Sequence, residues 1–406
     1  MFKPEYLDMS KLLQSQHIVK LFNAVEEHGG IIRFVGGAVR DTIAGLSGFE
    51  LDLATDLSPD ELSEACQDYG LKTVPIGLKL GTVGVVIDNQ ILIVSSLKKQ
   101  IYVDGKPAYI EFTDDWSADA AGRDLTINAV YADLDGNIFD YYNGIDDLEN
   151  GIVRFINNPQ DRINEDYLRI MRFFRFYAWF GKAPIDKASL NACIKYKDKL
   201  RTISIERVRD ELFKLLIAPN AAETLKIIYD NDILSFFLPK SEHIDALKRL
   251  SKIVANANYK GNFLRRLFVL YQPNAAYAEK IASTLRLTKK QKEDFVRWAK
   301  IEIHQDNLLS ISQRLKFIYR YGKQFCIDKI LLTLAIYNVT TQNLNEILQE
   351  IETAIVPIFP IRGKDIVTLG ISNSNIGKIL SKLEQAWIDS DFKLTRNELL
   401  QKITNN

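Results

Sequence analysis

The sequence of 406 residues predicts an α+β protein in which a small mixed-sheet domain is followed by an all-helical remainder. In the first 150 residues, short runs rich in β-branched and aromatic side chains are bounded by Gly, Asp and Asn, which is typical of strands joined by turns. From Asp161 onward, Leu, Ile, Lys and Phe recur at intervals of three and four, which indicates helices. Hydrophobic residues make up 47% of the chain, which is sufficient for a large core, and charged residues make up 26%.

The N-terminal elements can be placed in order. Strands are expected in the runs at 31–37, 51–55, 81–87, 90–97, 108–113 and 128–142. The last run is a hairpin, because residues 134–137, Leu-Asp-Gly-Asn, have the composition of a turn. Helical periodicity predicts helices at 38–45 and 58–68.

The remainder of the chain has almost no strand pattern, and we expect a helical array. Its helix ends or linkers are marked by Pro184, Pro219, Pro239, Pro273 and the stretch at 355–363.

The composition excludes several classes of protein. No apolar run approaches the roughly 18 residues of a membrane span. The first residues also lack the layout of a signal peptide, so we expect a cytoplasmic protein with no membrane contact. Cys66, Cys193 and Cys326 are widely separated, which favours buried thiols over disulfides or a zinc site. No protein partner is implied.

Charge is distributed unevenly, although the chain is neutral overall. Residues 1–150 carry 25 acidic against 11 basic side chains, whereas residues 244–300 carry 13 basic against 4 acidic ones. In the second segment, cations alternate with aromatic residues at helical spacing, which suits contact with a phosphate backbone. A solvated helix face has the same pattern, so both interpretations stand.

A pair of glycines, Gly36 and Gly37, separates an apolar strand from a helix that carries Arg40. Glycine lets the backbone turn tightly and approach a ligand, and a helix N-terminus offers unpaired N–H groups to an anion. This arrangement suits a triphosphate, although Gly-Gly between a strand and a helix is often only a turn.

Two carboxylates, Glu50 and Asp52, stand one residue apart in the next apolar run. Side chains at i and i+2 of a strand lie on the same face. The pair is therefore suited to holding Mg²⁺ beside the phosphate-binding turn for a displacement at phosphorus. A solvent-facing edge strand would carry the same residues.

Two further clusters lie downstream. Arg123 and Asp124 precede a strand, with Asn128 four residues after Asp124. Asp166 and Arg169 are three residues apart in a predicted helix and share a face, which is also consistent with a surface ion pair. A fixed carboxylate can accept from the exocyclic amine of cytosine or adenine while a neighbouring guanidinium donates to a ring acceptor. Uracil presents the opposite pattern and would be rejected.

Together these motifs resemble the class II tRNA nucleotidyltransferases, which are the CCA-adding enzymes, and the related bacterial poly(A) polymerases. The resemblance extends over roughly residues 30 to 240. It rests, in family order, on FVGGAVRDTIAG with the acidic strand after it, GRDLTINA, YNGIDDL, EDYLR and ISIERVRDEL.

The resemblance implies a nucleotidyltransferase head at 1–150, a helical neck with the base-reading helix at 151–218, a basic tRNA-binding body at 219–300 and a helical tail at 301–406. It implies addition of C and A from CTP and ATP to tRNA 3′ ends, with release of pyrophosphate. Glu50 and Asp52 would be catalytic and hold Mg²⁺. The residues expected to bind the nucleotide are Gly36, Gly37, Arg40, Arg123, Asp124, Asn128, Asp166 and Arg169. Those expected to contact RNA are Arg265, Arg266, Lys289 and Lys290.

Three positions depart from the family pattern. Glu50 stands where the family has Asp, Ile93 stands where an acidic residue is expected, and Gly122 replaces the first Arg of Arg-Arg-Asp. These departures leave two alternatives open. One is a catalytically reduced or silent relative that acts as an RNA-binding protein, and the other is an enzyme that adds only part of CCA, or poly(A).

Overall fold

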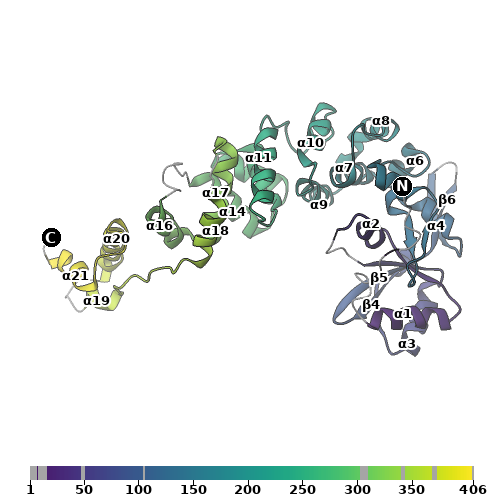
Figure 1. Cartoon of the computed structure of the whole chain (residues 1–406), viewed down its shortest axis with the longest axis horizontal. Helices are drawn as coiled ribbons and strands as arrows, with labels where there is room; N and C mark the ends of the chain where they lie inside the picture. The colour runs from purple at the N-terminus through teal and green to yellow at the C-terminus, as the bar shows by residue number, and fades with distance from the viewer. Residues whose placement is uncertain are drawn as a thin grey trace. The chain divides into compact units, whose positions relative to one another are not determined.

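The computed structural model describes residue 7 and residues 16–46, 51–103, 106–301, 310–339, 343–367 and 373–404. The chain divides into two compact units, residues 1–240 and 241–406, and each is described by itself. The first unit contains a mixed sheet followed by helices, and all elements of the second unit's described residues are helices (Figure 1). This arrangement confirms the predicted α+β class.

The main sheet of the first unit has the strand order β3-β4-β5-β2-β1-β8-β9. Its strands are β1 Ile32–Val35, β2 Asp52–Thr55, β3 Lys72–Gly77, β4 Thr82–Ile87, β5 Gln90–Ser96, β8 Val130–Ala132 and β9 Ile138–Asp140. β2 and β5 are parallel and the other pairs are antiparallel, so the sheet is mixed. A separate antiparallel hairpin consists of β6 Lys98–Val103 and β7 Lys106–Phe112.

The helices of the first unit include the two that periodicity predicts at 38–45 and 58–68, which are α2 and α3. The helices of this unit are α1 Gln16–Glu27, α2 Gly37–Ile43, α3 Pro59–Asp68, α4 Trp116–Gly122, α5 Gly144–Asn150, α6 Pro159–Glu165, α7 Arg169–Phe180, α8 Lys187–Tyr196, α9 Ile205–Leu216 and α10 Ala221–Asp230. Short 3₁₀ turns lie at η2 Leu78–Leu80, η3 Thr126–Asn128 and η4 Lys197–Thr202.

In the second unit, two of the predicted breaks separate helices: Pro273 lies between α12 and α13, and the stretch at 355–363 connects α18 to the start of α19. The helices of this unit are α11 Ile244–Asn256, α12 Phe263–Tyr271, α13 Ala275–Thr284, α14 Lys289–Lys300, α16 Ile311–Tyr321, α17 Lys323–Tyr337, α18 Leu344–Thr353, α19 Gly363–Val367, α20 Asn373–Asp389 and α21 Arg396–Thr404. In the described part of the chain, no helix is long and apolar enough to span a membrane.

Side chains alternate across the central strands and build a core on each face of the sheet. Phe34 and Leu53 pack with α1 and α3, and Figure 1 shows these two helices on the same side of the sheet. Val35 and Ala54 face the other way and pack with Trp116 of α4. This alternation follows from the two-residue period of a strand, and it anchors the β1–α2 turn and the start of β2 from both sides. The three cysteines are buried free thiols, as predicted.

The predicted helix that carries Asp166 and Arg169 is broken between them. α6 ends at Glu165, Asp166 is extended (φ −151°, ψ 109°), and α7 begins at Arg169. The Asp166 carboxylate accepts a hydrogen bond from the backbone N–H of Leu168 at 3.0 Å. Aspartate readily makes this local bond, which competes with helix formation. The expectation that both residues share one helix face is therefore wrong.

Candidate active site

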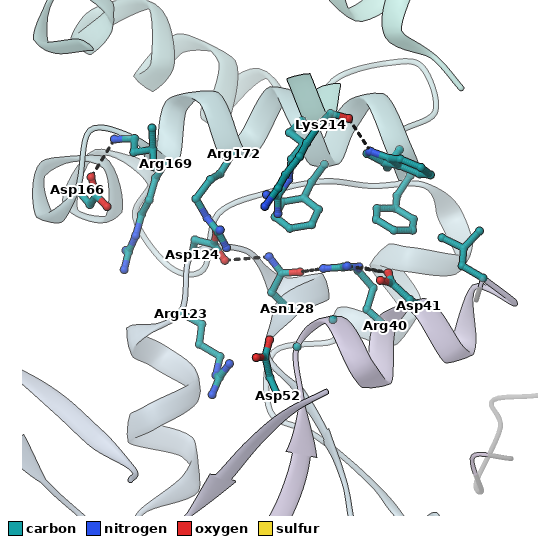
Figure 2. Close-up of a pocket in the computed structure, with 18 of the residues that line it drawn as sticks. Arg40, Asp41, Asp52, Arg123, Asp124, Asn128, Asp166, Arg169, Arg172 and Lys214 are labelled. Atoms are coloured by element: carbon teal, nitrogen blue, oxygen red, sulfur yellow. Dashed lines mark hydrogen bonds and ion pairs between the residues drawn. The ribbon is translucent and has the colours of Figure 1, made fainter. Parts of the chain in front are cut away.

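A cavity of about 750 Å³ in the first unit brings together the predicted site residues (Figure 2). It is lined by the β1–α2 turn, the start of β2, the segment after α4, and helices α7 and α9. The predicted residues on its wall are Gly36, Gly37, Arg40, Asp52, Arg123, Asp124, Asn128, Asp166 and Arg169. Glu50 lies outside the described residues.

The described wall of this cavity is rich in positive charge. Its cations are Arg40, Arg123, Arg169, Arg172, Arg175, Arg207 and Lys214, against the carboxylates Asp41, Asp52, Asp124 and Asp166. A cleft lined predominantly by one sign of charge raises the local concentration of the opposite charge. The cavity therefore suits a polyphosphate.

The β1–α2 turn requires glycine at Gly36, which has a positive φ of 61°. A Cβ atom there would lie 3.7 Å from Nη1 of Arg123. The turn and the arginine are therefore neighbours, and the small residue leaves room at this end of the cavity.

Asp52 is the first residue of β2, and its Cα pairs with that of Ile93 on the parallel strand β5. Laterally paired residues of neighbouring strands lie on the same face of the sheet. Ile93, one of the departures from the family pattern, is therefore beside Asp52. Among the described residues, no group of three or more His, Cys, Asp and Glu side chains forms a metal site.

A chain of hydrogen bonds joins α2 to α7 along the wall of the cavity. Arg40 donates to the Oδ1 atom of Asn128 at 2.5 Å, and the Asn128 amide donates to Asp124 at 2.9 Å. Arg172 of α7 donates to the other oxygen of Asp124 at 2.5 Å. Figure 2 shows Asp124, Asn128 and Arg40 in a row above Asp52, with Arg172 reaching Asp124 from α7.

Asp124 is buried, and burial by itself raises the pKa of a carboxyl group. The charge of Arg172 and the hydrogen bonds from Arg172 and Asn128 outweigh this effect and hold the pKa of Asp124 well below its usual range. Asp124 is therefore a fixed carboxylate at neutral pH.

Asp166 and Arg169 both line the cavity, but each is held by a different partner. Asp166 accepts from Arg207 of α9 at 2.8 Å. Arg169 donates to Glu165 at 2.6 Å and to the carbonyl oxygen of Gly122 at 3.0 Å. These bonds hold Asp166 and Arg169 in the cavity wall by separate partners. The bond from Arg169 to Gly122 also links α7 directly to the end of α4.

An aromatic wall and several cations of this site are absent from the sequence-based prediction. Phe176, Trp179 and Phe180 line the cavity, and the guanidinium of Arg40 lies 4.6 Å from the ring centre of Phe176. Arg172 follows Arg169 by three residues on α7, so helical spacing from the predicted arginine is the signal that could have identified it.

The proposed RNA contacts in the basic segment separate into two groups. Arg265 and Arg266 are 3% and 8% exposed, and Arg265 pairs with Asp328 at 3.3 Å. Their expected role as surface contacts to phosphate is wrong, because α12 is covered by other helices of its unit. Lys289 and Lys290 are exposed at the start of α14.

The sheet and the arginine-rich cavity define a nucleotidyltransferase head. Residues 32–154 match the family model "Poly A polymerase head domain", and residues 184–244 match "Probable RNA and SrmB- binding site of polymerase A".

The chain belongs to the class II CCA-adding tRNA nucleotidyltransferase family. It is 32% identical over 380 residues to CCA tRNA nucleotidyltransferase 1, mitochondrial, of Homo sapiens, which covers 92% of this chain and 86% of that protein. Its fold is similar to that of the Bacillus stearothermophilus CCA-adding enzyme in complex with CTP, with a TM-score of 0.74 and 21% identity over 96% of this chain and 98% of that chain. The Thermotoga maritima CCA-adding enzyme complexed with tRNA gives a TM-score of 0.65 and 18% identity, with 98% of each chain covered.

Proposed function

We propose that this chain is a template-independent nucleotidyltransferase that adds C and A from CTP and ATP to tRNA 3′ ends. The observation that carries the proposal is that one cavity holds the Gly36–Gly37 turn, Asp52, and the Asp166 and Arg169 side chains. The triphosphate, the reacting phosphorus and the base thus each have groups suited to them in a single site. The relatives named as CCA-adding enzymes support the same substrates.

In the proposed reaction, the 3′-hydroxyl oxygen of the tRNA attacks the α-phosphorus of the nucleotide. The new O3′–P bond forms, the bond from that phosphorus to pyrophosphate breaks, and the hydroxyl proton is released. Arg40 and Arg123 bind the charged triphosphate, and Asn128 and Asp124 hold Arg40 and Arg172 in place. Such pre-arranged donors stabilise the charge that develops in the transition state.

Nucleotidyltransferases of this family generally use a divalent metal ion. Asp52 fits such an ion, because its carboxylate lies at the same cavity wall as the proposed triphosphate site and carboxylate oxygens are the ligands that Mg²⁺ prefers. We propose that Asp52 holds Mg²⁺ together with Glu50. When bound, the ion neutralises phosphate charge and lowers the pKa of the attacking hydroxyl.

The test of the function is incorporation of labelled nucleotide into a tRNA that lacks its 3′-terminal CCA. We expect incorporation of C from CTP alone, and full extension with CTP and ATP together. A-only products would instead identify a poly(A)-type or partial activity. Absence of all incorporation, with tRNA binding retained, would identify a silent RNA-binding relative. The observation that favours this alternative is Ile93, which stands beside Asp52 where the family has an acidic residue.

Base choice gives a first prediction. Replacing Asp166 by Ala removes the acceptor that disfavours uracil, so UTP should compete better against CTP by about 1–3 kcal/mol. CTP affinity should change much less, because the phosphate-binding arginines stay in place. Competition between labelled CTP and UTP measures the ratio.

Arg207→Ala is the matched variant for this prediction, because it removes the ion-pair partner of Asp166 and leaves the acceptor. It should relax base choice less than Asp166→Ala. An unchanged CTP-to-UTP ratio in an active Asp166→Ala enzyme would refute the base-reading role.

The exposed start of α14 gives a second prediction. If Lys289 and Lys290 contact tRNA phosphates, the double variant Lys289→Glu with Lys290→Glu should bind tRNA more weakly. The slope of the logarithm of the binding constant against the logarithm of the salt concentration should become shallower by up to about 2. Titrations at several salt concentrations measure the slope.

The control is Lys378→Glu with Lys382→Glu on α20, two exposed lysines whose replacement changes the net charge equally. An equal effect of both pairs would show a general charge effect and remove the assignment to α14.

The division into head, neck, body and tail and the cytoplasmic location are parts of the same proposal. The relative from Homo sapiens is named a mitochondrial enzyme, so cell fractionation is the test of location.

A further inference from the structure

Arg123 is held at two of its three guanidinium nitrogens. Its Nε donates to the hydroxyl of Tyr131 at 3.1 Å and to Asp119 at 3.3 Å, and its Nη2 donates to Asp119 at 3.1 Å. The third nitrogen, Nη1, is the one that lies 3.7 Å from the Cβ position of Gly36. Nη1 of Arg123 therefore faces the β1–α2 turn, while Nε and Nη2 are held by Tyr131 and Asp119.

The two holding residues are themselves fixed. The Tyr131 hydroxyl donates to Asp119 at 2.8 Å, and the second oxygen of Asp119 accepts from the backbone N–H of Lys98 at 3.2 Å. Tyr131 is fully buried, and its ring packs edge-on against Trp116 with 5.3 Å between ring centres. Asp119 is also buried. Neither side chain is part of the cavity wall, whereas Arg123 is.

We infer that Asp119 and Tyr131 are positioning residues that aim Nη1 of Arg123 at the triphosphate of the incoming nucleotide. The inference rests on the proposed function. A guanidinium held in advance loses less conformational freedom when it binds phosphate, and it need not reorient as charge develops. Gly122 stands where the family pattern has the first arginine of Arg-Arg-Asp. Arg123 is therefore the one arginine of that motif in this chain, and its orientation matters more.

The test is Tyr131→Phe, which removes one hydroxyl and keeps the buried ring. Binding of CTP should weaken about tenfold, the effect of one lost hydrogen bond to a charged group. Binding of cytidine, which lacks phosphates, should change less than about twofold, because no base-reading residue is altered. The KM for CTP should rise accordingly. The matched control is Tyr142→Phe, which removes the hydroxyl of a half-buried tyrosine that donates to the carbonyl of Ser117.

Combination with Arg123→Ala separates positioning from folding. In that background, Tyr131→Phe should have no further effect on CTP binding, although any effect on thermal stability should persist. Asp119→Asn, which weakens the hold on Nη2, is a second test of the inference. It should likewise weaken the binding of CTP more than the binding of cytidine.

Equal losses for CTP and cytidine, or additive effects with Arg123→Ala, would overturn the inference. So would an active enzyme in which Tyr131→Phe and Asp119→Asn bind CTP like the wild type, and the proposed function would then survive. A wild-type protein that binds neither CTP nor ATP would overturn the proposed function and the inference with it.

Discussion

Asp52→Asn should lower the rate of nucleotide incorporation by roughly three orders of magnitude at any Mg²⁺ concentration, about 4 kcal/mol of transition-state stabilisation. Asparagine has nearly the same shape but lacks the negative charge that binds a divalent ion. Asp52 stands at the first position of β2, where its side chain faces the cavity. The free energy of unfolding should therefore change by less than about 1 kcal/mol.

Rates are measured by single-turnover incorporation of CTP, and stability by urea unfolding. Asp60→Asn is the matched control, because it neutralises an exposed carboxylate in the same unit, on α3, and should leave the rate unchanged. Turnover of Asp52→Asn near the wild-type rate would remove Asp52 from the catalytic site.

Asp124→Asn should lower both stability and activity, because Asp124 is the buried junction between Arg172 and Asn128. The change leaves the Arg172 guanidinium without its carboxylate. Loss of one partner of a buried pair typically costs 3–5 kcal/mol. Since about a third of the Arg172 side chain is exposed, we expect the free energy of unfolding to fall by about 2–3 kcal/mol. Incorporation should fall more than tenfold, because Arg40 loses its support through Asn128.

The pKa of Asp124 gives this prediction a pH dependence. Because its pKa in the folded state lies below the unfolded value, the ionised group contributes stability above the unfolded pKa, and this contribution is lost as the pH falls through the folded pKa. The stability difference between wild type and Asp124→Asn should be constant from pH 6 to pH 8 and shrink in acid.

Asp135→Asn, in the exposed β8–β9 turn, is the control and should change stability by less than about 0.5 kcal/mol. An Asp124→Asn protein as stable as the wild type at neutral pH would contradict the role of the ion pair.

Local motifs identified the residues of the site that lie close together in sequence. Gly36 and Gly37 follow a strand directly, and Arg123, Asp124 and Asn128 fall within six residues. The backbone geometry of a strand–turn–helix or a short turn places such residues together whatever surrounds them. The first unit's mixed sheet followed from the same kind of local pattern. β3 did not, because Lys72–Gly77 contains Pro75 and its described side chains show no buried alternation.

Contacts between distant segments were not predictable in this way. Arg172 meets Asp124 across 48 residues, and Arg207 meets Asp166 across 41. No spacing rule connects such positions in a single sequence. The break at Asp166 was also missed, because the apolar periodicity continues through it and a single side-chain bond to the backbone of Leu168 ends the helix.

The sequence by itself determined the α+β class, seven of the strands, helices α2 and α3 of the head, and a group of nearby residues that line one cavity, since short-range geometry places them. Tertiary structure alone decided which charges face solvent. Arg265 and Arg266 lie within the same basic segment as Lys289 and Lys290, yet the first two are buried and the last two are exposed. Helical periodicity predicts on which face of its own helix a side chain lies. Whether that face is buried depends on the other helices that pack against it.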